Sequence, residues 1–323
     1  MLPRTRFFSA VFSGFALAAI LAAQTALTSP PASGGDAATP VFSTETNYVP
    51  LNVTVTDKSD HLVTNLPQSA FSVYENNVLQ PIKIFKNEDV PVSMALVIDN
   101  SGSMRSKRAG VEASALALVK DSNPQDETFV VNFNDEPYLD QDFTSDINVL
   151  QKGLARIDSK GGTAMRDAIR VSIDHLHDKA AHDKKVVIVI TDGNDNASMV
   201  TLDSLKKLAQ QDGTLIYAIG LLGEEDKSEA GKAKKALKEL TEATGGQVFY
   251  PEHVEDVDPI AHLVAHDIRN QYSIWYAPLN EKQDGTFRTI KVVVKAPGNP
   301  VARTRMGYWA TPSRKPTGSA NPQ

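Results

Sequence analysis

The sequence has no cysteine and no excess of positive charge. Without cysteine there can be no disulfide, thiolate metal site, cysteine nucleophile or lipid-modified cysteine. The formal net charge of -6, from 33 basic and 39 acidic residues, leaves no basic stripe of the kind that neutralises a phosphate backbone. We therefore expect no nucleic-acid partner, and any metal must be held by oxygen or imidazole.

Long apolar runs are also scarce, and the exception lies at the amino end. Residues Phe7 to Ala23 are apolar, follow Arg4 and Arg6, and lead to the small residue Ala26. This pattern predicts a signal peptide over residues 1–26 and thus an exported protein, periplasmic or secreted. An uncleaved membrane anchor stays open, because about 17 to 25 apolar residues can span a bilayer.

The length of 323 residues allows one large domain and a smaller companion. Residues 27–45 have the composition of a linker and residues 311–323 that of a disordered tail. Between them we predict a β segment at 46–90, an α/β domain at 91–268 and a second β segment at 269–310.

The two β segments show apolar residues alternating with polar ones, as in Leu51–Val55 and Tyr272–Tyr276. Such alternation predicts half-buried antiparallel strands. Tight turns are predicted at Asn76-Asn77, because Asn tolerates positive φ, and at Asp284-Gly285, where a second hairpin is expected. We expect the two segments to pair as a small β-sandwich-like domain into which the α/β domain is inserted.

The central segment has a different pattern, in which continuous apolar runs alternate with helical stripes. Continuous runs are typical of parallel strands covered on both faces. The fold class predicted is therefore α/β, with a doubly wound, mostly parallel sheet. The runs are Met94–Ile98, Phe129–Val131, Val186–Ile190 and Leu215–Ile219, and the stripes lie within 111–119, 169–180, 202–208 and 233–240.

Polar side chains follow two of these predicted strands. Asp99 ends one run and is followed by Ser101 and Ser103, while Asp192 follows another run and Thr163 comes after two glycines. Ligands of open α/β sheets bind at the carboxyl ends of strands, so we expect these five residues to meet. Two carboxylates and three hydroxyls favour Mg²⁺ or Mn²⁺, with Ca²⁺ also open.

The pattern Asp99-x-Ser101-x-Ser103, then Thr163, then Asp192 resembles the metal-ion-dependent adhesion site of von Willebrand factor A and integrin I domains. The resemblance implies that the three hydroxyls bind the metal directly and the aspartates largely through water. Segments such as Phe71–Glu75 are also similar to an exported VWFA-related family common in acidobacteria.

Neighbouring residues are candidates for the rim or support of this site. Asp167 either supports the loop through hydrogen bonds or favours the positive end of its helix, and Asp195 either shapes the rim or is a plain loop residue. The full set is Asn100, Gly102, Gly162, Asp167, Gly193 and Asp195.

Histidines provide a weaker alternative for metal binding. His175, His177 and His182 alternate with aspartates, but we interpret them as a solvated helix end. His262 and His266 have the i, i+4 spacing of a zinc helix without the glutamate of a zinc protease, and we expect surface or packing roles for them.

Three functions remain open from the sequence. The first is a non-enzymatic adhesion or assembly module whose cation binds an Asp or Glu exposed on an unknown partner protein. The second is an envelope scaffold in which the cation only stabilises the fold. The third is a Mg²⁺-dependent hydrolase, for which the sequence offers no nucleophile elbow or Walker motif. Any membrane contact is expected only through an uncleaved amino-terminal segment.

Overall fold

The computed structural model describes residues 48–87, 89–155, 159–224 and 226–312. The predicted signal peptide, the predicted linker and most of the predicted tail lie outside the described residues. Within the described ranges, no helix combines the length and apolar character needed to cross a membrane.

The central part of the chain forms a six-stranded sheet in the order β10-β9-β8-β5-β6-β7. Every neighbouring pair is parallel except β6 with β7. This confirms the predicted α/β class with a mostly parallel sheet. The strands are β5 Val92–Asp99, β6 Glu127–Phe133, β7 Pro137–Thr144, β8 Lys184–Thr191, β9 Leu215–Gly220 and β10 Val248–Phe249.

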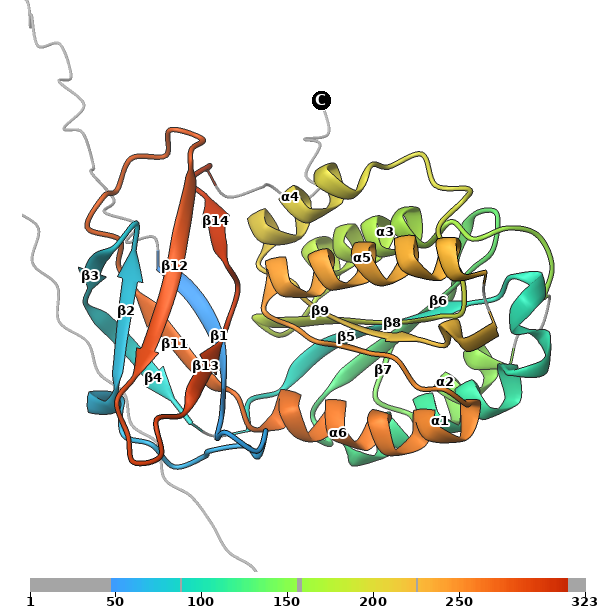
Figure 1. Cartoon of the computed structure of the whole chain (residues 1–323), viewed down its shortest axis with the longest axis horizontal. Coiled ribbons are helices and arrows are strands. Elements are labelled where there is room, and N and C mark those ends of the chain that lie inside the picture. Colours follow the sequence, from blue (N-terminus) through green and yellow to red (C-terminus); the bar gives the residue numbers. More distant parts are fainter. Residues whose placement is uncertain (1–47, 88, 156–158, 225, 313–323) are drawn as a thin grey trace, which may run out of the picture. The chain divides into compact units, whose positions relative to one another are not determined.

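Helices cover both faces of this sheet (Figure 1). One face packs against α1 Arg108–Asp121, α2 Ile147–Leu154 and α6 Val257–Arg269, and the other against α3 Met165–Lys179, α4 Leu202–Asp212 and α5 Lys227–Thr244. Short 3-10 turns lie at Gln68–Ala70, Gly102–Ser106, Leu222–Glu224 and Val254–Asp256.

The continuous apolar strands explain this double cover. In β5, Met94, Leu96 and Ile98 belong to one core cluster, whereas Ala95 and Val97 belong to the other. Because successive strand residues point to opposite faces, a strand between two helix layers needs an apolar residue at every position. Each fully buried aliphatic side chain contributes roughly 1.5 to 3 kcal/mol.

Some helices and strands of this domain lack the apolar pattern by which the others were predicted. Strand β7 is half exposed and lies at the edge of the sheet, so it shows no continuous apolar run. Helix α2 has eight residues, and strand β10 has two, too few for a clear period. Helix α6 was apparent only from the spacing of His262 and His266.

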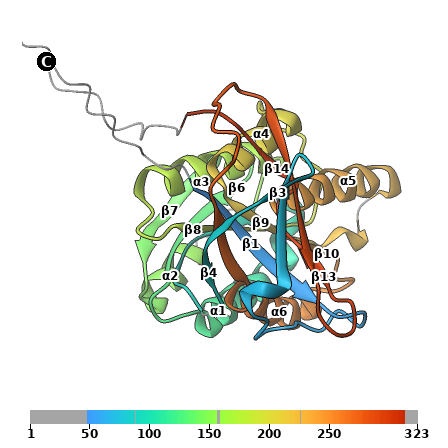
Figure 2. The same cartoon turned by 90° about the vertical axis from the view of Figure 1, so that its left-hand side faces the viewer.

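The flanking segments form two antiparallel four-stranded sheets with a shared apolar core, in the foreground of Figure 2. One sheet has the order β13-β1-β11-β4 and the other β14-β12-β2-β3, so each contains strands from both ends of the described chain. The strands are β1 Val49–Thr56, β2 Phe71–Glu75, β3 Val78–Gln80, β4 Ile82–Lys86, β11 Tyr272–Tyr276, β12 Phe287–Val294, β13 Val301–Arg303 and β14 Gly307–Trp309.

One of the two predicted hairpins is confirmed and the other is wrong. Asn76 and Asn77 have φ angles of 47° and 66° and connect the paired strands β2 and β3. The strands on either side of Asp284-Gly285 do not pair, because β11 joins β1 and β4 while β12 joins β2 and β14. Asp284-Gly285 is a turn within a connection that passes from one sheet to the other.

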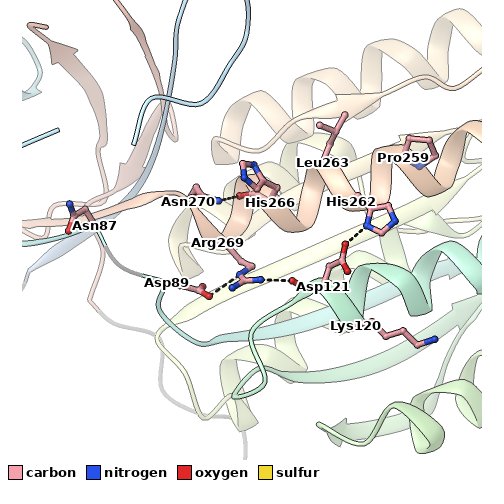
Figure 3. Close-up of a pocket in the computed structure, with 10 residues that line it drawn as sticks. All are labelled: Asn87, Asp89, Lys120, Asp121, Pro259, His262, Leu263, His266, Arg269 and Asn270. Carbon is pink, nitrogen blue, oxygen red and sulfur yellow. Dashed lines mark hydrogen bonds and ion pairs between the residues drawn. The ribbon is translucent and has the colours of Figure 1, made fainter. Parts of the chain in front are cut away.

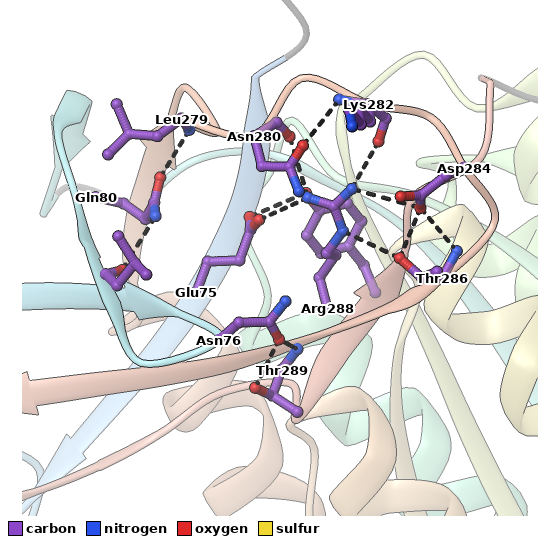
Figure 4. Close-up of polar contacts among 12 residues, drawn as sticks. Glu75, Asn76, Gln80, Leu279, Asn280, Lys282, Asp284, Thr286, Arg288 and Thr289 are labelled. Carbon is purple, nitrogen blue, oxygen red and sulfur yellow. Dashed lines mark hydrogen bonds and ion pairs between the residues drawn. The ribbon is translucent and has the colours of Figure 1, made fainter.

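A buried ion pair fixes that connection (Figure 4). Arg288, 1% exposed, donates from Nη1 to Glu75 Oε1 at 3.0 Å and to the carbonyl of Asn280 at 3.1 Å. Its Nη2 donates to the carbonyl of Lys282 at 2.7 Å and lies 3.5 Å from Asp284 Oδ1. A guanidinium has five donors in a planar fork, so one side chain can bond to several residues of this connection.

Asp267 of α6 joins the helix to strands of both parts of the chain. Its Oδ1 accepts from Thr54 Oγ1 at 2.7 Å. Its Oδ2 accepts from Tyr217 Oη at 2.7 Å and from Arg303 Nη2 at 2.5 Å. A carboxylate with three donors satisfies its buried lone pairs, so these contacts stabilise the junction.

Candidate functional site

The sheet has a topological switch point at the carboxyl ends of β5 and β8. The chain leaves β5 towards β6 on one side and returns to β8 on the other, so the strand order reverses at this point. Open α/β sheets bind ligands where the order reverses. Asp99 is the last residue of β5, and Asp192 directly follows β8.

Asp99 is fully buried at this switch point. Its Oδ1 accepts the N–H of Ser101 at 2.8 Å, and its Oδ2 accepts Thr191 Oγ1 at 2.5 Å. Burial raises the pKa of Asp99 to about 6; the bonds from Thr191 and Ser101 oppose this shift, and the nearby charge of Asp192 adds to it. A cation beside Asp99 would favour the charged carboxylate.

The two serines extend from Asp99 to Asp192. Ser101 Oγ lies 3.1 Å from Ser103 Oγ, and Ser103 Oγ donates to Asp192 Oδ1 at 2.8 Å. The 3-10 turn that starts at Gly102 brings both hydroxyls to one side. Ser101 is buried and Ser103 is exposed, so the series of oxygen atoms runs from the protein interior to solvent.

Thr163 lies in a loop held against this turn. The N–H of Gly102 is 3.5 Å from the carbonyl of Gly161, and the N–H of Thr163 donates to Asn196 Oδ1 at 2.9 Å. The Thr163 carbonyl accepts in return from the N–H of Asn196 at 3.1 Å. Helix α3 begins at Met165 without a side-chain cap, so Thr163 precedes the helix rather than capping it.

The predicted supporting residues mostly hold loops. The Asp167 carboxylate accepts the N–H groups of Met199 at 2.9 Å and Val200 at 3.0 Å, which supports the loop after β8. Asp195 accepts from the N–H of Arg166 at 2.7 Å and from its Nη2 at 3.0 Å. Both aspartates therefore organise the loops that adjoin Thr163.

The remaining predicted rim residues lie along the same loops. The N–H of Asn100 donates to the carbonyl of Phe133 at 2.6 Å. The N–H of Gly162 donates to Asp135 Oδ1 at 2.7 Å. Gly193 approaches Thr191 Oγ1 through its N–H at 3.4 Å.

Sequence reasoning missed two polar residues that contact the site aspartates. Thr191, the last residue of β8, donates to Asp99, and Lys107 Nζ lies 2.8 Å from Asp192 Oδ2. Lys107 follows Ser103 by four residues, so a helical turn before α1 would have brought it near the serines. Its position at a helix start gave no reason to assign it to the site.

The donor atoms of this arrangement suit a hard divalent cation. Asp99, Ser101, Ser103 and Asp192 offer only oxygen, and Thr163 adds a hydroxyl-bearing residue on the adjoining loop. Oxygen ligands of this kind are preferred by Mg²⁺, Mn²⁺ and Ca²⁺. Among the described residues, no three His, Asp or Glu side chains cluster as a metal-binding group, so hydroxyls would have to complete this site.

The helical histidines take structural positions. His175 packs against Phe129 and Phe143, with ring centroids 4.6 and 5.3 Å away. His177 Nδ1 lies 2.7 Å from Asp212 Oδ1. Both side chains are largely enclosed, at 12% and 13% exposure, so the predicted solvated helix end is wrong for them.

His262 and His266 line an open groove of about 1060 Å³ beside α6 (Figure 3). His262 Nδ1 bonds to Asp121, which raises the pKa of His262. Arg269 bonds to Asp89 at 2.9 Å across the same groove. Both α6 histidines are exposed, which agrees with the surface role among the two that we expected for them.

Comparison with known proteins gives a family match that includes all five predicted site residues. The sequence model of the von Willebrand factor type A domain matches residues 94–194, which begin in β5 and end just after β8. Calcium-activated chloride channel regulator 1 from Mus musculus is 28% identical over 183 residues, or 53% of this chain. The alignment covers 18% of that relative's length, so the chain corresponds to a small part of it.

Solved structures are also similar to this chain. A von Willebrand factor type A protein from Catenulispora acidiphila has a TM-score of 0.49 and 13% identity, covering 83% of this chain and 75% of that one. The vWF domain of the type V pili tip protein Mfa5 from Porphyromonas gingivalis has a TM-score of 0.45 and 16% identity, covering 56% and 97%. The match over residues 94–194 shows a von Willebrand factor type A domain in this part of the chain.

Proposed function

We propose that this chain is an extracytoplasmic protein-binding module, used in adhesion or assembly, that holds a divalent cation and through it binds a partner's carboxylate. The observation that carries this proposal is the hydrogen-bonded series Asp99, Ser101, Ser103 and Asp192 at the switch point of the sheet. We assign Ser101, Ser103 and Thr163 as direct ligands and the two aspartates as ligands acting through water.

The residues around the series support these roles. Thr191 and the N–H of Ser101 orient the buried carboxylate of Asp99. The buried Arg108 places Nη1 3.4 Å from the backbone carbonyl of Asp99. Ser103 is exposed, so a partner can approach the outer end of the series. When bound, the ion would supply positive charge and an exchangeable water position that a carboxylate can take.

We expect Mg²⁺ or Mn²⁺ in this site, with Ca²⁺ open, because selectivity among these ions depends on cavity size and flexibility. The proposed partner is a protein with an exposed Asp or Glu. Export rests on the predicted signal peptide at 1–26, and membrane attachment would require that segment to stay uncleaved. We propose no catalytic role for the site.

Water-proton relaxation in the presence of Mn²⁺ tests the carboxylate step directly. Metal-stripped protein loaded with Mn²⁺ is titrated with acetate and, as an uncharged control of similar shape, with acetamide. We expect acetate alone to lower the relaxation enhancement, because it replaces a water molecule on the ion. An equal response to both solutes, with Mn²⁺ bound, would contradict carboxylate binding.

The same sample separates the two other functions that the sequence left open. If the cation only stabilises the fold, Mn²⁺ raises the unfolding midpoint by mass action but acetate leaves the relaxation unchanged. If the protein is a hydrolase, it turns over a generic phosphate or ester, and Asp99→Ala abolishes that turnover. Either result would replace the proposed function.

A further inference from the structure

Lys107 brings a positive charge into the proposed metal site. It connects the 3-10 turn Gly102–Ser106 to α1, and its Nζ lies 2.8 Å from Asp192 Oδ2. The Lys107 side chain is 12% exposed and that of Asp192 is 0% exposed. The pair is therefore enclosed, where screening by solvent is weak.

Both oxygens of the Asp192 carboxylate have a donor in this arrangement. Oδ1 accepts from Ser103 Oγ and Oδ2 from Lys107 Nζ, each at 2.8 Å. A divalent ion that used Asp192, directly or through water, would place a second positive charge next to this ammonium. Two cations at such a separation repel each other strongly in a partly enclosed site.

Lys107 does not stabilise the start of helix α1. It is the N-cap of α1, where side chains that accept hydrogen bonds are preferred, and it makes no capping bond. A positive charge also interacts unfavourably with the positive end of the helix dipole. From this position the lysine contacts Asp192.

We propose that Lys107 is a tethered cation that competes with the divalent ion for Asp192. The inference rests on the metal site proposed above. In the metal-free protein the ammonium neutralises Asp192 and stabilises the turn. Metal binding then requires the Lys107 side chain to leave Asp192, so this residue lowers the metal affinity and sets the cation concentration at which the site fills.

Calorimetric titration of the metal-stripped chain with Mn²⁺ and Mg²⁺ tests the competition. Lys107→Met removes the charge and keeps the apolar stem, Lys107→Arg keeps the charge, and Lys120→Met changes the net charge equally at an exposed position of α1. We expect about tenfold tighter metal binding for Lys107→Met, from relief of repulsion, and affinities close to wild type for the other two.

Thermal unfolding supplies a second readout, which can be measured without bound metal. Metal-free Lys107→Met should melt about 2 to 4 °C below wild type, because Asp192 loses its charged partner, and saturating Mg²⁺ should abolish or reverse the difference. Equal dissociation constants for wild type and Lys107→Met, with both binding, would overturn the competition while leaving the metal site standing. Absence of binding in both would overturn the site and the competition together.

Discussion

Thr191 Oγ1 donates a 2.5 Å hydrogen bond to Asp99 Oδ2 and so joins the carboxyl ends of β8 and β5. The two residues are 92 positions apart, and both are fully buried. The bond orients one carboxylate of the proposed metal site from the neighbouring strand. It also supplies a hydrogen-bond donor to a charge that burial disfavours.

Thr191→Val should therefore destabilise the metal-free protein by about 1 to 3 kcal/mol, because a buried carboxylate loses a donor while the side-chain shape is kept. Urea unfolding at pH 8, above the pKa of about 6 for Asp99, measures the loss. Thr191→Ser keeps the hydroxyl and should cost clearly less. A Val variant no less stable than the Ser variant would contradict this role for the hydroxyl.

Gly161→Ala should disturb the loop that carries Thr163. Gly161 has a φ of +75°, and an added Cβ would lie 2.1 Å from Asp135 Oδ2. Gly285→Ala is a matched control, since its φ is +73° and nothing lies within 4 Å of the added atom. Urea unfolding should show a loss of about 1 kcal/mol for Gly285→Ala and a larger loss for Gly161→Ala.

The difference between Gly161→Ala and Gly285→Ala separates the steric clash with Asp135 from the free-energy cost of placing alanine at a positive φ. Adding Asp135→Ala to Gly161→Ala should recover part of the lost stability. Equal losses for the two glycine variants would mean that the loop moves freely away from Asp135.

Arg288→Met should lower the free energy of unfolding of the β part of the chain. The substitution leaves Glu75, 3% exposed, without its buried ion-pair partner and frees the carbonyls of Asn280 and Lys282. Breaking one partner of a buried pair costs roughly 3 to 5 kcal/mol. Lys291→Met, at an exposed position of the same strand, should change the free energy of unfolding by no more than about 0.5 kcal/mol. Similar urea midpoints for both variants would contradict the assigned role of Arg288.

Because of Lys184, the free energy of unfolding should increase with pH in the alkaline range. Its buried Nζ donates to the carbonyl of Ile268 at 2.5 Å, and burial lowers its pKa from 10.5 to about 8. The folded state thus prefers the neutral amine, so this group's contribution is lost as pH falls through 8 and grows as pH rises towards 10.5.

Unfolding of wild type and Lys184→Met at pH 7.5 and pH 10 measures this contribution. The stability of wild type relative to Lys184→Met should rise by about 2 kcal/mol between the two pH values, at 1.36 kcal/mol per pKa unit. A difference between the proteins that does not change with pH would show that Lys184 keeps its ordinary pKa.

The parallel sheet could be predicted because its central strands carry a strong local signal. Each of β5, β6, β8 and β9 is buried on both faces, so its apolar run is continuous. The same signal fixes where the strands end, and therefore where Asp99 and Asp192 lie. Their proximity follows from the topology of an open sheet rather than from any pairwise signal.

The missed features depend on contacts that sequence patterns do not encode. The partners of β11 and β12 are set by which sheet each strand joins, so the turn at Asp284-Gly285 was mistaken for a hairpin. Lys107 follows the 3-10 turn and contacts Asp192, which is 85 positions away in the sequence. Strand β7 escaped prediction because an edge strand needs little apolar cover.

The most direct test of the proposed metal site is calorimetric titration of the metal-stripped chain with Mg²⁺ and Mn²⁺. Wild type is measured beside Asp99→Ala, Thr163→Ala and Ser103→Ala, with Ser106→Ala as an exposed serine control in the same turn. We expect saturable one-site binding that is unchanged in Ser106→Ala and at least about tenfold weaker in the other variants. Absence of binding to wild type, or equal binding by all variants, would contradict the proposed site.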